Sequence, residues 1–149
     1  MVNKLNFLRR TVLPALVLLG LVAYQYYSEH QPPLSSEDVA ESGAVEAAYA
    51  ARRSGVWVET SGRIKRTLPD DNEGSRHQRF ILELDSGHTV LVAHNIDLAD
   101  RVPVSQDDVV KLRGRFESND RGGVIHWTHH DPDGSGPEGW IRAHGKTYR

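Results

Sequence analysis

The stretch HQRFILELDSGHTVLVAH, residues 77–94, decides the fold. Side chains two residues apart share a face of an extended chain, so Phe80, Leu82 and Leu84 fall on one face. The residues DSG at 85–87 favour a turn and lead into a second apolar run over 89–94. Two such runs joined by a short glycine-containing turn predict a β-hairpin.

Runs with the same period of two lie on both sides of this hairpin. They cover 56–65, 109–117 and 124–128, and a terminal hairpin over 140–149 is expected to turn at His144 and Gly145. The hairpin and these three runs give five strands, with an excursion between the third and the fourth. This order predicts a small closed β-barrel, and a sandwich with the same number of strands is the structural alternative.

The barrel pattern is similar to that of small periplasmic proteins with the OB-fold. The resemblance is carried by V.V.T.G.I, F.LEL..G..VLV and VSQDDVVKLRGRFE, and it implies a five-stranded Greek-key barrel. We therefore expect a mainly β protein with an OB-like barrel domain over residues 54–149. Residues 31–53 are expected to form a linker and a short amphipathic helix, which Ser35 or Ser36 would cap and Gly55 would end.

The amino-terminal residues 1–30 predict a membrane anchor or a signal segment. Lys4, Arg9 and Arg10 precede an uncharged run over 11–27, and a basic flank of this kind stays in the cytoplasm. The run just reaches the roughly 17–25 residues that a spanning helix needs. We expect an inner-membrane anchor with the domain in the periplasm, or secretion to the periplasm if the segment is a cleaved signal.

Composition excludes several classes of function. The formal net charge is −2, from 18 basic and 20 acidic side chains, so nucleic acid is an unfavoured partner. The chain has no cysteine, which excludes disulfides, thiolate zinc sites and a cysteine nucleophile. No G-x-S-x-G or H-E-x-x-H motif is present, so a serine nucleophile and a helical zinc motif are disfavoured.

A histidine-rich segment, GGVIHWTHHDP at 122–132, predicts a possible metal site. His77 and His94 begin and end the central hairpin, and their near-register would bring the two imidazoles together. A third ligand from the segment would complete a site for zinc or another divalent metal. The candidates from this segment are His126, His129 and His130. The alternative is that Ile125 and Trp127 pack in the core while the histidines form hydrogen bonds at the rim of the barrel.

Charged and aromatic side chains on the expected outer faces suggest a binding surface. OB barrels bind oligonucleotides or oligosaccharides over their second and third strands, so Arg79 is a candidate ligand-binding residue together with Trp57 and Trp127. The carboxylates of Asp70 and Asp71, in an expected loop, and of Asp97 could bind a harder cation, or could only form turns. Interleaved acidic residues also fit an ordinary solvated surface.

Longer literal motifs resemble a bacterial family of short exported proteins, the DUF3465-like domains of unknown function. These motifs are LPDDNEGSRHQRFIL at 68–82, VAHNIDLADRVP at 92–103, the histidine-rich segment, and GWIRAHGKTYR at 139–149. The resemblance covers about residues 54–149 and implies no activity.

Two classes of function follow from the sequence. The first is a tethered, noncatalytic envelope domain that binds a small polar ligand, a glycan or an envelope protein. The second is a metal-dependent hydrolase, such as a phosphodiesterase, in which a metal that activates water is held by His77, His94 and His130 with Asp131. In that hydrolase Arg76 or Arg79 would stabilise the negative charge that develops.

Overall fold

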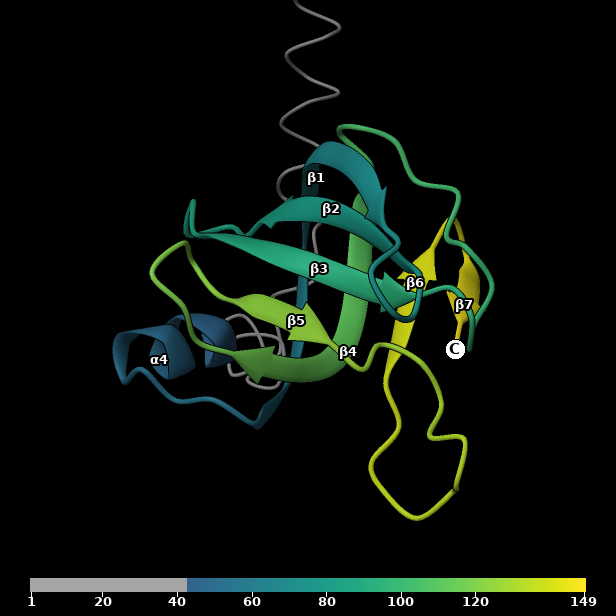
Figure 1. The fold of residues 1–149 in the computed structure, drawn as a ribbon. Helices are drawn as coiled ribbons and strands as arrows, with labels where there is room; N and C mark the ends of the chain where they lie inside the picture. Colours follow the sequence, from purple (N-terminus) through teal and green to yellow (C-terminus); the bar gives the residue numbers. More distant parts are fainter. Residues whose placement is uncertain (1–42) are drawn as a thin grey trace, which may run out of the picture. The chain divides into compact units, whose positions relative to one another are not determined.

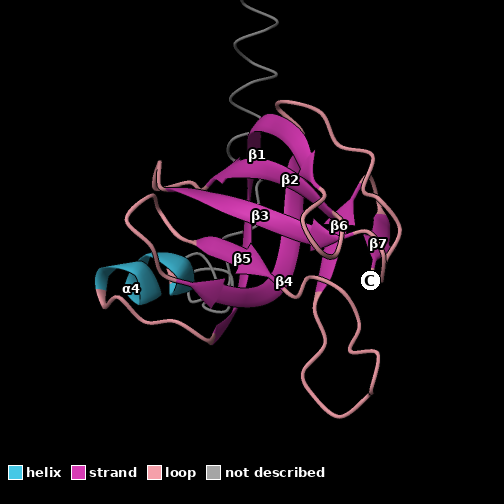
Figure 2. Ribbon diagram, viewed as in Figure 1, coloured by secondary structure: helices cyan, strands magenta, loops and turns pink. Residues whose placement is uncertain are grey.

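The computed structural model describes residues 43–149, which form a mainly β structure (Figure 2). Within these residues there is one short helix and there are seven strands. In chain order they are α4 (Ala44–Ala50), β1 (Val56–Asp71), β2 (His77–Glu83), β3 (Thr89–Asn95), β4 (Val109–Glu117), β5 (Val124–His126), β6 (Trp140–Ala143) and β7 (Lys146–Tyr148).

The strands close into a ring. β1 pairs with β2, β2 with β3, β3 with β5, β5 with β4, and β4 again with β1, so five strands form a barrel-like wall (Figure 1). The β3–β5 pair is parallel and the other pairs are antiparallel. The hairpin of β6 and β7 extends the sheet from β4. A ring replaces the two facing sheets of the sandwich alternative, so the prediction of a closed β structure is confirmed.

The interior of the ring is filled by the alternate residues that the sequence pattern predicts. β2 and β3 both alternate strictly between half-buried and buried positions, and β4 buries Val110, Leu112 and Phe116 as expected. Fully burying a side chain of this size contributes about 1.5–3 kcal/mol. The largest fully buried apolar side chains are Phe80, Phe116, Ile64, Leu82, Leu112, Ile125 and Ile141.

The first strand is longer than predicted. The sequence placed Asp70 and Asp71 in a loop, but β1 continues to Asp71. Pairing with β2 is irregular between Ile64 and Arg66 and again between Leu68 and Asp71. Such bulges bend a strand, and the second one accommodates Pro69, which has no amide hydrogen to donate to a ladder. The loop prediction for this segment was therefore wrong.

Helix α4 packs on the barrel through a small apolar face. Val45 and Ala48 are buried, and the Tyr49 ring lies 4.7 Å from the His88 ring. Part of the predicted helix before Gly43 lies outside the described residues, as does the predicted membrane segment at 1–30. Within residues 43–149 no helix has the length and apolar character that crossing a membrane requires.

Candidate binding face

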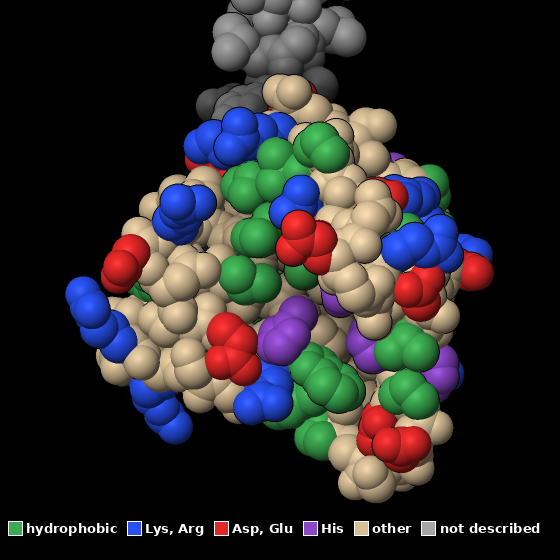
Figure 3. Space-filling model, in the orientation of Figure 1, with side chains coloured by type: hydrophobic (Ala, Val, Ile, Leu, Met, Phe, Trp, Pro, Cys, Tyr) green, Lys and Arg blue, Asp and Glu red, His purple; other side chains and the backbone are tan. Residues whose placement is uncertain are grey.

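The three predicted ligand-binding side chains, Trp57, Arg79 and Trp127, line clefts on the outer side of the ring. Three clefts occupy this surface, which we call the outer face. Figure 3 shows hydrophobic and histidine side chains exposed together there, with charged groups around them.

The first cleft, the basic cleft, has a volume of about 630 Å³ and lies over β1, β2 and β3. The second, the histidine cleft, has a volume of about 350 Å³ and is lined by Asp71, His77, Ala93, Glu117, Val124 and His126. The third, the tryptophan cleft, has a volume of about 310 Å³. It is lined by Trp57, Arg115 and Trp127 and by the loop residues Asp131, Asp133, Ser135, Gly136 and Pro137.

The strand register makes these clefts neighbours. Arg79 of the basic cleft is directly opposite Ala93 of the histidine cleft. Arg115 of the tryptophan cleft is directly opposite His126 of the histidine cleft. Arg115 Nε also lies 3.3 Å from Glu117 Oε1. The outer face therefore offers a continuous surface across four adjacent strands rather than three isolated sites.

Trp127 lies outside the barrel, although the core alternative placed it inside. Strand β5 ends at His126, and Trp127 has a left-handed backbone with φ of 54°. This turn reverses the alternation, so Trp127 is 40% exposed while Thr128 and His129 are 0% and 5% exposed. Positive φ is unfavourable for a bulky side chain and has to be enforced by the surrounding structure.

Gly139 is one of the residues that enforce this turn. Its amide donates a hydrogen bond to the His129 carbonyl at 2.9 Å. A Cβ at this position would lie 1.9 Å from the Trp127 carbonyl oxygen and 2.8 Å from the Arg113 carbonyl oxygen. The start of β6 therefore fits against the turn only because residue 139 has no side chain.

Both tryptophans have partners that hold their rings. The Trp127 ring stacks on the His129 ring, with centroids 5.7 Å apart and planes inclined by 27°. The Arg113 guanidinium lies 5.8 Å from the Trp57 ring centroid, which is within the range of a cation–π contact. Both rings line one cleft, and each is restrained by one of these contacts.

Asp131, a candidate catalytic residue, organises the loop between β5 and β6, which projects from the barrel (Figure 1). Its Oδ2 atom accepts hydrogen bonds from the amides of Gly136 at 2.7 Å and Ser135 at 2.9 Å. Hydrogen bonds from the amides of Gly136, Asp133 and Ser135 hold the pKa of this carboxyl below its usual range. The structure therefore gives Asp131 a positioning role at the edge of the tryptophan cleft.

His94 lies inside the barrel and is fully buried. Its Nε2 donates to the Asp100 carbonyl at 3.1 Å, because a carbonyl can only accept. Its Nδ1 must then accept from the Thr128 hydroxyl, at 2.9 Å. Burial lowers the pKa of His94 because the charged form loses its hydration, and the hydrogen bond to Asp100 opposes this shift.

The predicted pairing of His77 with His94 differs by one residue from the observed register. His77 is opposite Asn95, and His94 is opposite Gln78. Adjacent positions of a strand face opposite sides, so His77 lies on the outer face while His94 lies in the core. The expectation that the hairpin brings these two imidazoles together was wrong.

The other predicted metal ligands are divided between the inner and the outer side of the barrel wall. His129 is buried beneath Trp127 and donates from Nδ1 to the His130 carbonyl at 2.7 Å, whereas the side chain of His130 is exposed. His126 lies on the outer face near His77. In the part of the chain that the structure describes, no group of three or more His, Cys, Asp or Glu side chains could hold a metal ion.

The histidine cleft combines imidazoles with carboxylates. His126 Nε2 lies 3.5 Å from Glu117 Oε1. Burial lowers the pKa of His126, and the neighbouring Glu117 opposes this effect. Burial acts to raise the pKa of Glu117, but the contact with His126 and the positive charge of Arg115 outweigh it, so that pKa is lowered. A carboxylate acceptor is therefore present at the centre of the outer face over a wide pH range.

The arginines and aspartates predicted for charge stabilisation and hard cations pair with one another. Arg76 binds Asp97 through its amide and Nε, each at 2.8 Å. Arg79 donates to the Pro69 carbonyl at 3.0 Å and lies 3.8 Å from Asp71. Asp70 pairs with Arg101. These ion pairs tie β2 to β1, and they tie the loop after β3 to β1 and to the residue before β2.

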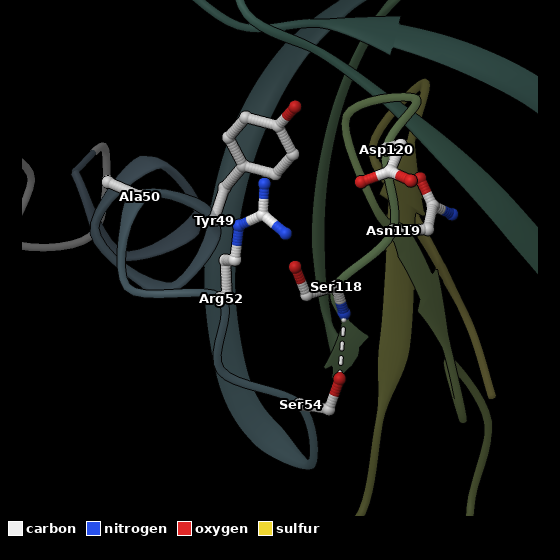
Figure 4. Close-up of a pocket in the computed structure, with 7 residues that line it drawn as sticks. All are labelled: Tyr49, Ala50, Arg52, Ser54, Ser118, Asn119 and Asp120. Carbon is white, nitrogen blue, oxygen red and sulfur yellow. Dashed lines mark hydrogen bonds between the residues drawn. The ribbon is translucent and has the colours of Figure 1, made fainter.

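A further cleft, of about 360 Å³, lies between α4 and the loop that joins β4 to β5 (Figure 4). Arg52 and Asp120 line it, and the Ser118 amide donates to Ser54 Oγ at 2.9 Å. The sequence did not predict this cleft, because it is formed by two irregular segments far apart in the chain.

The chain belongs to the family described as a protein of unknown function, DUF3465, which it matches over residues 30–149. This agrees with the resemblance of its motifs. A comparison with curated proteins gave no match.

Proposed function

We propose that this chain is a membrane-tethered, extracytoplasmic binding module with an OB-like barrel, and that it binds an extended glycan on its outer face. The strand order around the ring, with β1 paired to both β2 and β4 and with β3 parallel to β5, supports the OB assignment. OB barrels take oligosaccharides or oligonucleotides over strands two and three and the adjoining loops. The outer face includes β2 and β3, the second and third strands of the ring.

The observation that carries the proposal is the position of Trp127. Its side chain is 40% exposed on a left-handed backbone, and it lines the same cleft as Trp57. Unfavourable backbone conformations persist where the surrounding structure enforces them, and they cluster at binding sites. Two fixed aromatic rings provide apolar surfaces for the flat faces of sugar rings, which carry C–H groups.

Carboxylates on the same surface favour a glycan over a nucleic acid. Asp71 and Glu117 line the histidine cleft, and Asp131 and Asp133 line the tryptophan cleft. Carboxylates accept hydrogen bonds from sugar hydroxyls, and in these two clefts they disfavour the close approach of phosphates. The net charge of −2 acts in the same direction.

The tether comes from the basic and apolar residues at 1–30, which predict an inner-membrane anchor with the domain in the periplasm. A module held there would meet the glycans of the cell envelope. A divalent metal such as zinc at the histidines stays a prediction, and the binding role does not depend on it.

The test is binding of the full chain, in detergent micelles, to insoluble peptidoglycan and to soluble oligosaccharides. Trp127→Ala is expected to weaken binding about tenfold or more, since loss of one aromatic stacking contact costs about 1–3 kcal/mol. Leu98→Ala is the matched control, because Leu98 is 39% exposed and lines none of the three clefts. Equal affinity of wild type and Trp127→Ala for every glycan bound would refute the proposal.

A further inference from the structure

We infer that the glycan is anionic and that the basic cleft receives its carboxylate or phosphate groups. This inference rests on the proposed function and adds the charge of the ligand. The basic cleft is the largest of the three on the outer face, at about 630 Å³.

Cations reach this cleft from three separate elements. Lys65 and Arg66 come from β1, Arg79 comes from β2, and Arg121 comes from the loop between β4 and β5. No aspartate or glutamate is among the residues that line it. This local excess of positive charge contrasts with the net negative charge of the whole chain.

Two of the four cations are available to a ligand. Lys65 pairs with Glu83 at 2.8 Å, and Arg79 lies 3.8 Å from Asp71. The guanidinium groups of Arg66 and Arg121 make no hydrogen bond or ion pair within residues 43–149, and both residues are exposed. Guanidinium binds carboxylate and phosphate oxygens through two parallel hydrogen bonds, which makes arginine suited to either group.

The surface between the cations is apolar. Leu68, Ile81 and Leu91 line the cleft and are half-buried. An inorganic anion would make no use of this surface, whereas a sugar ring can lay its C–H face against it while its charged group contacts an arginine. The combination fits a charged sugar unit better than a free ion.

The distance between the clefts requires an extended ligand. The basic cleft lies over β1, β2 and β3, while the tryptophan cleft is lined by Trp57 of β1, Arg115 of β4 and residues after β5. Neighbouring strands are about 4.8 Å apart, so the path along the outer face from β2 across β3 and β5 to β4 covers about 14 Å. A ligand that contacts both clefts is therefore an oligosaccharide rather than a single sugar.

The experiment uses the full chain in detergent micelles with three soluble polymers: polygalacturonate, which carries carboxylates, poly(glycerol phosphate), and neutral dextran. Calorimetric titrations at low and high salt measure affinity. We expect binding to at least one anionic polymer that weakens as salt rises. The polymer that binds more tightly identifies the charged group as carboxylate or phosphate.

Variants assign this binding to the cleft. Arg66→Glu combined with Arg121→Glu is expected to reduce affinity for the anionic polymer about tenfold or more. Arg52→Glu combined with Arg53→Glu makes the same change in net charge away from the outer face and is expected to leave affinity nearly unchanged. Equal loss in both double variants would overturn the inference, because binding would then follow only total charge.

The two proposals fail in different ways. Binding of dextran as tight as that of both anionic polymers, or wild-type affinity in the Arg66 and Arg121 double variant, overturns the anionic assignment. A glycan role at the tryptophans survives that result. Dependence on the two arginines without any dependence on Trp127 overturns the proposed glycan function and leaves the anion site in place.

Discussion

Trp127 and the two residues that follow it lie on opposite sides of the barrel wall. Trp127 is exposed on the outer face, whereas Thr128 and His129 are buried beneath it. The large aromatic residue is outside and the polar residues are inside, which reverses the usual distribution. The comparison shows that one left-handed residue at the end of β5 converts a core position into an exposed one.

The inner side of this turn is stable because its polar groups have partners. His94 bonds to the Thr128 hydroxyl and the Asp100 carbonyl, and Gln78 exchanges hydrogen bonds with the backbone of Val102 at 2.7 and 2.9 Å. A buried polar group without a partner costs about 1–3 kcal/mol. Exposed polar groups on the outer side are hydrated by solvent and do not need such partners.

The largest effect is expected from Gly139→Ala, which acts on the contact that fixes the turn. The added Cβ would meet three backbone atoms, of which the Trp127 carbonyl oxygen at 1.9 Å is the nearest. Backbone atoms cannot rotate away, so we expect a loss of about 4 kcal/mol in the free energy of unfolding. Urea denaturation measures this loss.

Gly136→Ala is the control in the neighbouring loop. Its Cβ would meet only the Asp131 carboxylate, at 3.2 Å, and we expect a loss below about 1 kcal/mol. Equal losses in the two variants would mean that Gly139 does not fix the turn.

The next largest loss in the free energy of unfolding is expected on the inner side of the barrel wall, at His94. His94→Ala removes a fully buried ring and leaves the Thr128 hydroxyl and the Asp100 carbonyl without their partner. We expect a loss of about 2–3 kcal/mol at neutral pH. His130→Ala, which removes an exposed ring from the same segment, should change the free energy of unfolding by less than about 0.5 kcal/mol. Similar results for both variants would contradict the assignment of inner and outer sides.

A smaller effect is expected in the dependence of the free energy of unfolding on pH. The pKa of His94 is lower in the folded protein than the ordinary histidine value of 6.5, so the unfolded chain takes up a proton first as pH falls. The contribution of His94 to the free energy of unfolding is therefore fully present above about pH 6.5. It decreases below that pH until the folded state also binds the proton. His126 contributes in the same direction.

His94→Gln separates the two histidines. It should flatten the dependence of the unfolding free energy on pH more than His126→Gln does, since His94 is the more deeply buried. Thermal unfolding between pH 5 and 8 measures both. A dependence that is unchanged in His94→Gln would show that other groups cause it.

The smallest effect is expected for Trp127→Gly. Glycine adopts positive φ without strain, which compensates for the loss of contacts made by an exposed ring. We expect the free energy of unfolding to change by less than about 1 kcal/mol. Ile125→Ala, two residues earlier and fully buried, should cost about 3 kcal/mol. A loss for Trp127→Gly as large as that for Ile125→Ala would place Trp127 in the core after all.

Much of the fold followed from local patterns. The alternation in residues 109–117 predicted the bounds of β4, and the turn at His144 and Gly145 predicted the hairpin of β6 and β7. These elements follow from the period of two and from turn residues, which act over a few positions. The extension of β1 to Asp71 did not follow, because its turn-forming residues are held in a strand by pairing with β2.

The candidate site was predicted by residue type more than by position. Trp57, Arg79 and Trp127 were selected as ligand-binding residues, and all three line clefts on the outer face. The pairing of His77 with His94 failed by one position of register, which is enough to place one ring outside and the other inside. Arg66 and Arg121 were not selected, because nothing in their local sequence shows that they meet across a cleft.

By itself the sequence determined that this chain builds a closed β structure from short alternating strands, since that alternation depends only on neighbouring residues. The tertiary structure decided which side of the wall each histidine and tryptophan occupies. Register and a single left-handed turn depend on contacts between distant segments, such as that of Gly139 with Trp127, and no local pattern encodes them.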